Sequence, residues 1–218
     1  MSALYGLRLR IDRKRINMIT DAELITKYNE YYSNDKGKWA IVDRDRLAFD
    51  TIVNFIPEPL EVLDIGCGNG HTLAYFQKRH ATAKLYGIDL SQVAIDLAKE
   101  KLPEANLEVA FLQEYAPRKK FQVIVCLGTA EHFTQLPEDL KRMKGLLKKD
   151  GVCYVEIPNN LAYDKGEHNF RQLSGGSRQY EWHLSKEEWE EKLIAAGFEI
   201  VKFYRRNKPQ WEFCWVLR

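Results

Sequence analysis

Two carboxylates and three glycines lie around the end of one short apolar segment. The chain reads Val-Leu-Asp-Ile-Gly-Cys-Gly-Asn-Gly from position 62, which places Asp64 in the apolar run and Gly66, Gly68 and Gly70 directly after it. Glycines that follow a strand let the backbone approach a ligand, because no Cβ stands in the way. A helix after such a turn presents free N–H groups. Asp89 ends the next apolar segment, where a carboxylate can accept hydrogen bonds from two ribose hydroxyls.

The glycine spacing bears on which ligand this turn binds. A dinucleotide site requires the pattern G-x-G-x-x-G, and His71 stands where the third glycine of that pattern would be. Asp64, two residues before the first glycine, would repel a pyrophosphate but can bind an ammonium group. The turn therefore favours a ligand with a ribose, a cationic amino-acid end and no phosphate. S-adenosylmethionine is such a ligand, and a nicotinamide dinucleotide is the competing one.

Glu131 and His132 follow another apolar segment, residues 121–127, and are the pair best suited to proton transfer. An unperturbed histidine has a pKa of about 6.5, which suits a general base near neutral pH. We therefore predict that His132 is the catalytic base and that Glu131 orients it. The alternatives are that His132 only shapes a pocket and that Glu131 lies on the surface.

Aromatic side chains near the N-terminus have two interpretations. Tyr28, Tyr32 and Trp39 can form a lid over the ligand, because aromatic rings attract a sulfonium through cation–π contacts. Plain packing between helices explains them equally well.

The elements that position these residues alternate along the chain. Apolar strand-like segments alternate with amphipathic helices, which predicts right-handed βαβ crossovers and a parallel sheet covered on both faces. Helical patterns cover about 21–33, 44–55, 71–79, 91–102, 137–148 and 185–196, and strand patterns cover 61–65, 85–88, 107–112, 121–127, 152–157, 198–204 and 211–217. The last two strands are joined by a short loop and are therefore antiparallel. The predicted fold is α/β, Rossmann-like and doubly wound, with a mostly parallel seven-stranded sheet, a C-terminal antiparallel hairpin and helices on both faces.

Composition excludes several classes of protein. The chain has 218 residues and a formal net charge of +2, so no global field attracts nucleic acid or a membrane. No apolar run reaches the roughly 20 residues that span a bilayer. The basic start, Met1 to Asn17, is not expected to act as a secretory signal. The four cysteines form no C-x-x-C pair and predict buried, reduced thiols in a cytoplasmic protein, with no metal site.

From about residue 40 to the end, the chain resembles the class I S-adenosylmethionine-dependent methyltransferases. Within them it looks like the ubiquinone-biosynthesis O-methyltransferase and related small-molecule enzymes. The resemblance rests on the glycine turn, on Ile88-Asp89-Leu90-Ser91 and on the segment from Val125 to His132, with later landmarks at Lys149-Asp150-Gly151 and Ala196-Gly197-Phe198. It implies that Arg46 binds the cofactor carboxylate. It also implies that Leu90 lies beside the ribose and that the Leu127 backbone contacts the cofactor.

The departures from the family pattern narrow these expectations. Gln122 stands where the family has an aspartate at the start of its fourth strand. No acid follows the third strand cleanly, so Gln113, or else Glu114, is expected to meet the adenine amine. Gly128 occupies the position of a glutamate that joins a metal site in the ubiquinone-pathway enzymes, so we predict no metal.

These observations predict a methyltransferase that uses S-adenosylmethionine to methylate oxygen, or less favourably nitrogen, of a small molecule. Its expected organisation is a basic lead-in (1–20), a helical cap (21–58) and the methyltransferase domain (59–218), in which residues 159–183 cover the acceptor. One alternative is a macromolecule methyltransferase whose basic residues 8–15 bind RNA or protein. The other is a non-catalytic regulatory subunit that binds the cofactor.

Overall fold

The computed structural model describes residues 21–34, 42–53, 55–56, 60–159, 182, 184–206 and 212–218. Within these ranges seven strands form one sheet in the order β3-β2-β1-β4-β5-β7-β6. The strands are β1 (Glu61–Ile65), β2 (Lys84–Asp89), β3 (Asn106–Val109), β4 (Phe121–Leu127), β5 (Leu147–Pro158), β6 (Ile200–Arg206) and β7 (Glu212–Leu217). β1 to β5 pair in parallel, and β7 pairs antiparallel with both β5 and β6. The predicted mixed sheet with a terminal hairpin is confirmed.

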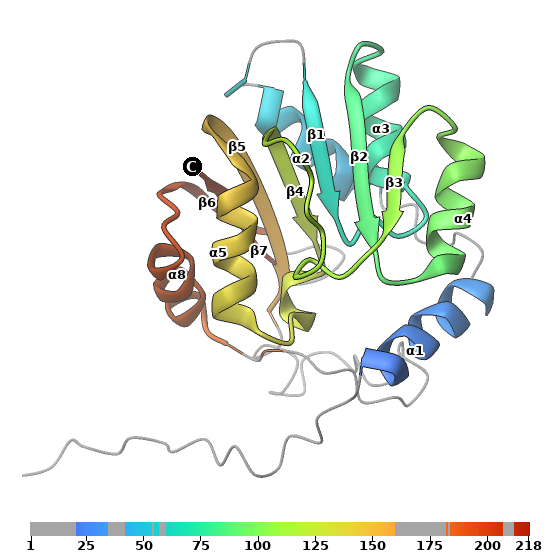
Figure 1. Cartoon of the computed structure of the whole chain (residues 1–218). Coiled ribbons are helices and arrows are strands. Elements are labelled where there is room, and N and C mark those ends of the chain that lie inside the picture. Colours follow the sequence, from blue (N-terminus) through green and yellow to red (C-terminus); the bar gives the residue numbers. More distant parts are fainter. Residues whose placement is uncertain are drawn as a thin grey trace, which may run out of the picture.

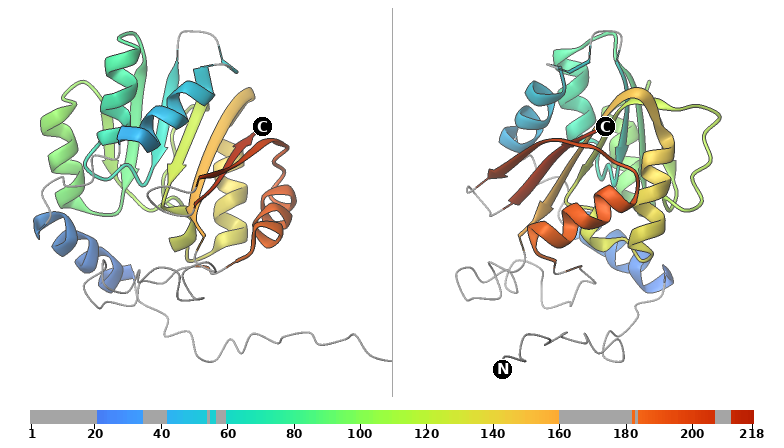
Figure 2. Two further views of the ribbon diagram at one scale, coloured as in Figure 1. Left: turned by 180° about the vertical axis from the view of Figure 1, so that it is seen from behind. Right: turned by 90° about the vertical axis from the view of Figure 1, so that its left-hand side faces the viewer.

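Helices cover both faces of the sheet (Figure 1 and Figure 2). They are α1 (Asp21–Asn34), α2 (Val42–Val53), α3 (His71–Arg79), α4 (Gln92–Lys101), the 3-10 turn η2 (Ala130–His132), α5 (Leu136–Leu146) and α8 (Lys186–Ala195). The buried side chains of α2, α3 and α4 share one apolar core with one face of the sheet. Those of α5 and α8 share a second core with the other face, in which Trp189 and Trp215 are almost fully buried. Each sheet face is thus removed from water, as short apolar parallel strands require.

The chain order reverses direction between β1 and β4. From β1 the sheet runs outward through β2 and β3 on one side, and through β4 and β5 on the other. A crevice opens outside the carboxyl ends of the strands at such a switch point, and ligands bind there in open α/β sheets. In Figure 1 this edge is the lower one, next to α1 and η2.

Capping residues begin or end several helices at the positions that the sequence predicts. The Ser91 hydroxyl accepts a hydrogen bond from the Ala94 N–H (3.1 Å) and caps α4. Ser185 and Glu188 form a reciprocal capping box at the start of α8. Gly197 follows α8 with φ +93°, a conformation that is open to glycine at little cost.

β5 is longer than the sequence predicts. The Lys-Asp-Gly sequence before Val152 was expected to turn, yet the strand begins at Leu147. The register with β4 shifts between Phe121 and Val123, so the extra residues are accommodated by an irregularity in the ladder. A Cβ on Gly151 would lie 2.9 Å from the Gln122 carbonyl oxygen, so this close approach of two backbones requires glycine.

Several predictions fall outside the described residues. These are the basic lead-in, Trp39 and nearly all of segment 159–183, of which only Asn159 and Trp182 are described. All four cysteines are described; each is buried, and none of them is in a disulfide. Among the helices of the described ranges, none has the length and apolar character needed to cross a membrane.

Candidate functional site

The glycine turn after β1 is tied to the end of β2. The Gly66 and Cys67 N–H groups both donate to the Ile88 carbonyl oxygen, at 2.9 and 3.0 Å. Gly66 and Gly68 have φ angles of +75° and +52°, which L side chains adopt only with strain. A Cβ on Gly68 would lie 2.5 Å from the Tyr32 hydroxyl oxygen. Gly68 is therefore needed both for the turn and for the close approach of α1.

Asp89 lies at the end of β2, with only 8% of its surface exposed. Its Oδ2 accepts from the Gly68 N–H and its Oδ1 from the Ser91 N–H, both at 2.9 Å. Burial raises the pKa of Asp89 above its ordinary value, and these backbone hydrogen bonds oppose that shift. An ionised carboxylate offers about four lone-pair sites, so acceptor capacity remains for hydroxyl donors in the cavity.

A cavity of about 280 Å³ opens at this edge of the sheet. It brings together nine of the ten residues for which the sequence predicts a role. These are Asp64, Gly66, Gly68, Asp89, Leu90, Gln113, Leu127, Glu131 and His132. They come from the ends of β1, β2 and β4, the segment after β3 and the turn η2, so the parallel topology assembles them from distant parts of the chain.

Arg46 is the predicted residue that the structure does not bring to this cavity. Its side chain is exposed on α2, and it is not among the residues that line the cavity. α2 packs against α3 on one face of the sheet. A carboxylate-binding role for Arg46 finds no support in this position.

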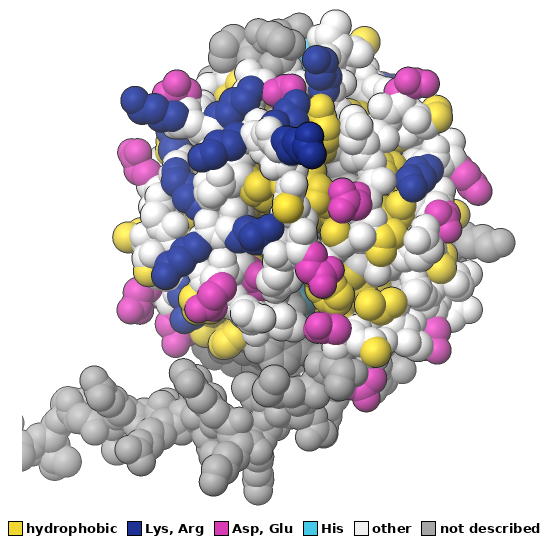
Figure 3. Space-filling view, viewed as in Figure 1, with side chains coloured by type: hydrophobic (Ala, Val, Ile, Leu, Met, Phe, Trp, Pro, Cys, Tyr) yellow, Lys and Arg dark blue, Asp and Glu magenta, His cyan; other side chains and the backbone are white. Residues whose placement is uncertain are grey.

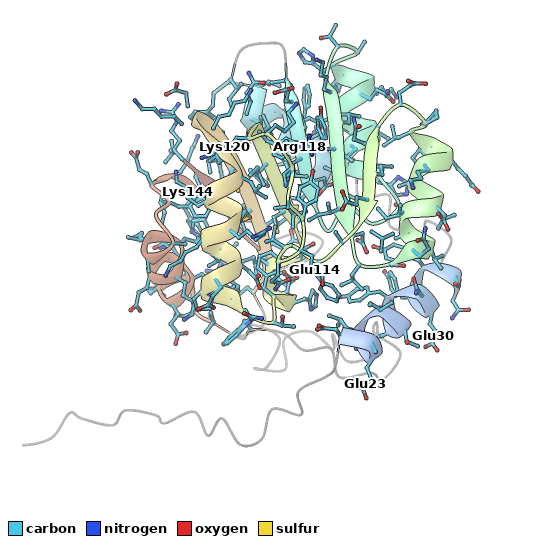
Figure 4. All side chains as sticks on the ribbon, in the orientation of Figure 1. Glu23, Glu30, Glu114, Arg118, Lys120 and Lys144 are labelled. Carbon is cyan, nitrogen blue, oxygen red and sulfur yellow. The ribbon has the colours of Figure 1, made fainter. Side chains whose placement is uncertain are left out.

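The segment after β3 lines one wall of the cavity. Ala110, Phe111, Leu112 and Gln113 line it, whereas Glu114 is exposed and lies outside the lining (Figure 4). Gln113 is therefore the better of the two predicted adenine contacts. Behind it, burial raises the pKa of Asp139 to about 6, while hydrogen bonds from the Gln135 backbone and the Gln113 side chain favour its ionised form.

His132 and Glu131 lie together on η2 at the other end of the cavity. The Glu131 Oε1 and the His132 Nε2 are 3.7 Å apart, and the Glu131 side chain is only 2% exposed. This burial excludes the alternative in which Glu131 lies on the surface. The Tyr28 ring meets the His132 ring edge-on, with centroids 6.1 Å apart. Trp182 also lies here, because its backbone N–H donates to the Glu131 carbonyl oxygen (2.8 Å).

Sequence reasoning missed two carboxylates that line the same cavity. Glu156 on β5 and Glu212 on β7 are 1% and 5% exposed. The Cys214 thiol lies 3.7 Å from the Glu156 Oε2 across the β5–β7 pair. The available signal was a single acidic residue within or next to an apolar strand, the same signal that identified Asp64. Burying a carboxylate costs free energy, so an acid in such a position indicates a functional or hydrogen-bonded site.

Tyr28, Tyr31 and Tyr32 bring α1 to the cavity, which is consistent with the predicted lid. Burial, reinforced by the nearby Asp89, raises the pKa of Tyr32 well above its ordinary value, so its hydroxyl stays protonated. Within the described residues, no group of three or more histidine, cysteine or acidic side chains is arranged to bind a metal ion.

The fold and the position of the cavity define a class I, Rossmann-like methyltransferase domain. A family model described as a methyltransferase domain matches residues 40–202, so the chain belongs to this methyltransferase family.

Curated relatives include a ubiquinone biosynthesis O-methyltransferase of Rhodopseudomonas palustris (strain BisB5), 28% identical over 66% of this chain and 60% of the relative. A trans-aconitate 2-methyltransferase of Variovorax paradoxus (strain S110) is 30% identical over 48% of this chain and 41% of the relative. The chain thus spans 60% or less of the length of these relatives.

Solved structures share the fold at low identity. The magnesium protoporphyrin IX methyltransferase of Synechocystis PCC 6803 with bound S-adenosylhomocysteine superposes with a TM-score of 0.67 at 14% identity, over 90% of this chain and 98% of that one. An S-adenosylmethionine-dependent methyltransferase of Clostridium acetobutylicum ATCC 824 gives a TM-score of 0.65 at 16% identity, over 88% and 98%.

Proposed function

We propose that this protein transfers a methyl group from S-adenosylmethionine to an oxygen atom of a small molecule. The observation that carries the proposal is Asp89, a buried carboxylate that faces a cavity beside a glycine turn and keeps acceptor capacity for a ribose. Membership of the methyltransferase family supports the same reaction.

The residues of the cavity fit this cofactor. Asp89 accepts from the two ribose hydroxyls, and the Gly66–Gly68 turn allows close approach of the chain to the ligand. Asp64, only 2% exposed, provides negative charge for the ammonium of the methionyl end. Phe111 and Leu112 provide apolar surface for the adenine, with the Gln113 amide for its amine. The cofactor supplies a methyl group already activated by the positive sulfur, so the protein mainly has to align the acceptor with it.

The same residues disfavour a dinucleotide. The pyrophosphate of a dinucleotide would lie against the glycine turn, next to the buried carboxylate of Asp64. Water cannot screen the Asp64 carboxylate at that depth, so the phosphate charges would be repelled. A titration with NADH is expected to give no saturable binding.

At the acceptor end, His132 would take the hydroxyl proton as the acceptor oxygen bonds to the methyl group, while the bond between that methyl and the sulfur breaks and S-adenosylhomocysteine is left as the product. A general base of this kind contributes roughly 10²- to 10⁴-fold to a rate. Glu131, whose Oε1 lies 3.7 Å from the His132 Nε2, favours the imidazolium that the proton transfer creates.

A nitrogen acceptor is the second candidate, and the buried glutamates favour it. Glu156 and Glu212 line the cavity together with Glu131. Carboxylates are acceptors only, so this wall suits an acceptor that presents N–H groups. We propose that residues 159–183 cover whichever acceptor binds.

The proposal is tested by incubating the protein with methyl-labelled cofactor and a fractionated lysate. Label in one class of small metabolite supports it, and cleavage of the labelled product identifies oxygen or nitrogen as the methylated atom. Label in RNA or protein that disappears when residues 1–17 are removed would instead establish a macromolecule methyltransferase. Cofactor binding without transfer to any fraction would favour a regulatory subunit.

A further inference from the structure

Helix α1 lies across the carboxyl edge of the sheet (Figure 1) and has one apolar residue with almost no exposed surface, Leu24. Tyr28, Tyr31 and Tyr32 are partly buried where they line the cavity. Glu23 and Glu30 extend away from the body of the protein (Figure 4). One buried leucine contributes roughly 1.5–3 kcal/mol, which is a weak determinant of the position of a whole helix. A polar contact with α4 adds a second, directional determinant of the position of α1.

This contact is made by Asn29. Its Oδ1 accepts a hydrogen bond from the Ser91 hydroxyl (2.7 Å) and a second from the Val93 N–H (3.3 Å). The first N–H groups of a helix have no partner within the helix. Ser91 satisfies Ala94, and Asn29 satisfies Val93 from a helix 64 residues away in the chain. Asn29 therefore acts as a second N-cap of α4, provided by another element.

The same contact is connected to the ligand-facing carboxylate. The Ser91 N–H donates to the Asp89 Oδ1 at 2.9 Å, while the Ser91 hydroxyl donates to Asn29. Ser91 is fully buried. The position of α1 is thus linked through a single residue to the position of Asp89.

Asn29 lies between the two tyrosines that face the cavity. Tyr28 and Tyr32 are four residues apart and so share one side of α1. The Tyr28 ring meets His132, and the Tyr32 hydroxyl meets the Gly68 backbone. Fixing the helix at Asn29 therefore places one aromatic ring next to the predicted base and the other next to the glycine turn.

We propose that Asn29 is a positioning residue that clasps α1 onto the N-terminus of α4 and so closes Tyr28 and Tyr32 over the cofactor. The inference rests on the proposed function, because the tyrosines have to cover a bound S-adenosyl compound. Asn29 itself does not touch that compound.

The test compares two substitutions that differ in one property. Asn29→Leu keeps the size of the side chain and removes the acceptor, whereas Asn29→Asp keeps an acceptor oxygen. We expect Asn29→Leu to bind S-adenosylhomocysteine about tenfold more weakly by calorimetry, the order expected for two lost hydrogen bonds. Asn29→Asp is expected to bind within twofold of the parent, as is the exposed control Glu30→Gln.

A double-substitution cycle separates positioning from general destabilisation. If Asn29 acts through the tyrosines, Asn29→Leu adds less than a twofold loss in a background that carries Tyr28→Ala and Tyr32→Ala. A full tenfold additional loss in that background would overturn the proposal, as would equal affinities of parent and Asn29→Leu.

Amide hydrogen exchange of the ligand-free protein gives a readout that does not depend on the proposed function. We expect α1 amides to exchange faster in Asn29→Leu, with α8 amides unchanged, and Asn29→Asp to restore the slow rate. Unchanged exchange of α1 would refute the clasp. If exchange follows this pattern while the parent binds no S-adenosylhomocysteine, the clasp stands and the proposed cofactor is wrong.

Discussion

Carboxylates at the two edges of the sheet have pKa values that are shifted in opposite directions. Asp89, at the carboxyl edge, is buried, and burial raises its pKa above the ordinary value of 3.8. Glu61, at the amino edge where β1 begins, accepts from the Lys119 and Lys148 ammonium groups, which lower its pKa from 4.5 to about 2. Figure 3 shows lysine and arginine side chains gathered over the edge where β4 and β5 begin.

This difference separates what stabilises the protein from what serves its function. Ionisation of Glu61 is more favourable in the folded chain than in the unfolded chain, so it stabilises the fold. Ionisation of Asp89 is less favourable in the folded chain, so it costs stability. A carboxylate whose ionisation opposes folding and that faces a cavity is typical of a functional site, which supports the proposed ribose role of Asp89.

The largest effect is expected for His132→Ala at the carboxyl edge. Loss of a general base is expected to lower turnover by 10²- to 10⁴-fold, with the cofactor affinity unchanged. Steady-state kinetics with the identified acceptor measure it, and His80→Ala, at the end of α3, is the matched control. Turnover within threefold of the parent would leave His132 with a shaping role alone.

A smaller but still large effect is expected for Asp89→Ala. Hydrogen bonds to a charged group contribute about 1.5–3 kcal/mol each, so the affinity for S-adenosylhomocysteine should fall at least tenfold. In the parent, binding should also weaken as the pH falls through the raised pKa of Asp89, because the protonated carboxyl loses acceptor capacity. Calorimetry across the acid range measures both, with the exposed Glu100→Gln as control. Unchanged affinity in Asp89→Ala would refute the ribose role.

Two glycines sharpen the contrast between the site and the rest of the fold. Gly68→Ala introduces a Cβ at positive φ and against Tyr32, so we expect several-fold weaker binding and lower stability. Gly145→Ala, in α5, meets nothing within 4 Å and should stabilise the protein by about 0.5–1 kcal/mol without affecting binding. Thermal unfolding and calorimetry compare them. Equal behaviour of the two variants would contradict the account of the turn.

The smallest effect is expected at the amino edge. Glu61→Gln removes a carboxylate that lies 2.9 Å from Lys148, and the free energy of unfolding should fall by at most about 1 kcal/mol, since both lysines are partly exposed. The loss should be full above pH 4.5, the ordinary pKa, and should vanish as the pH approaches about 2. Ligand affinity should not change. A loss of ligand affinity in Glu61→Gln would contradict the assignment of stability to the amino edge and of ligand binding to the carboxyl edge.

The sequence predicts the cofactor side of the cavity better than the acceptor side. Asp64, the glycine turn and Asp89 are identified because each follows or ends a strand, and position relative to a strand end is a local property. Glu156 and Glu212 enter the cavity through the pairing of β5 with β7, and no local pattern states which strands are neighbours. Asn29 was missed for the same reason, since its partners lie more than 60 residues away.

The sequence also predicts the ends of helices more accurately than the start of strand β5. Ser91 and the Ser185–Glu188 box specify their helices through hydrogen bonds within four residues. The start of β5 depends instead on Gly151 packing against the Gln122 backbone of a neighbouring strand. Arg46 was assigned by family spacing alone, and its exposed side chain on α2 is not among the residues that line the cavity.

A crystal structure grown with S-adenosylhomocysteine tests the central claim most directly. The account predicts density for the nucleoside with both ribose hydroxyls on Asp89 and the amino-acid end beside Asp64, under Tyr32. Density elsewhere, or a cavity without the compound at saturating concentration, would contradict it.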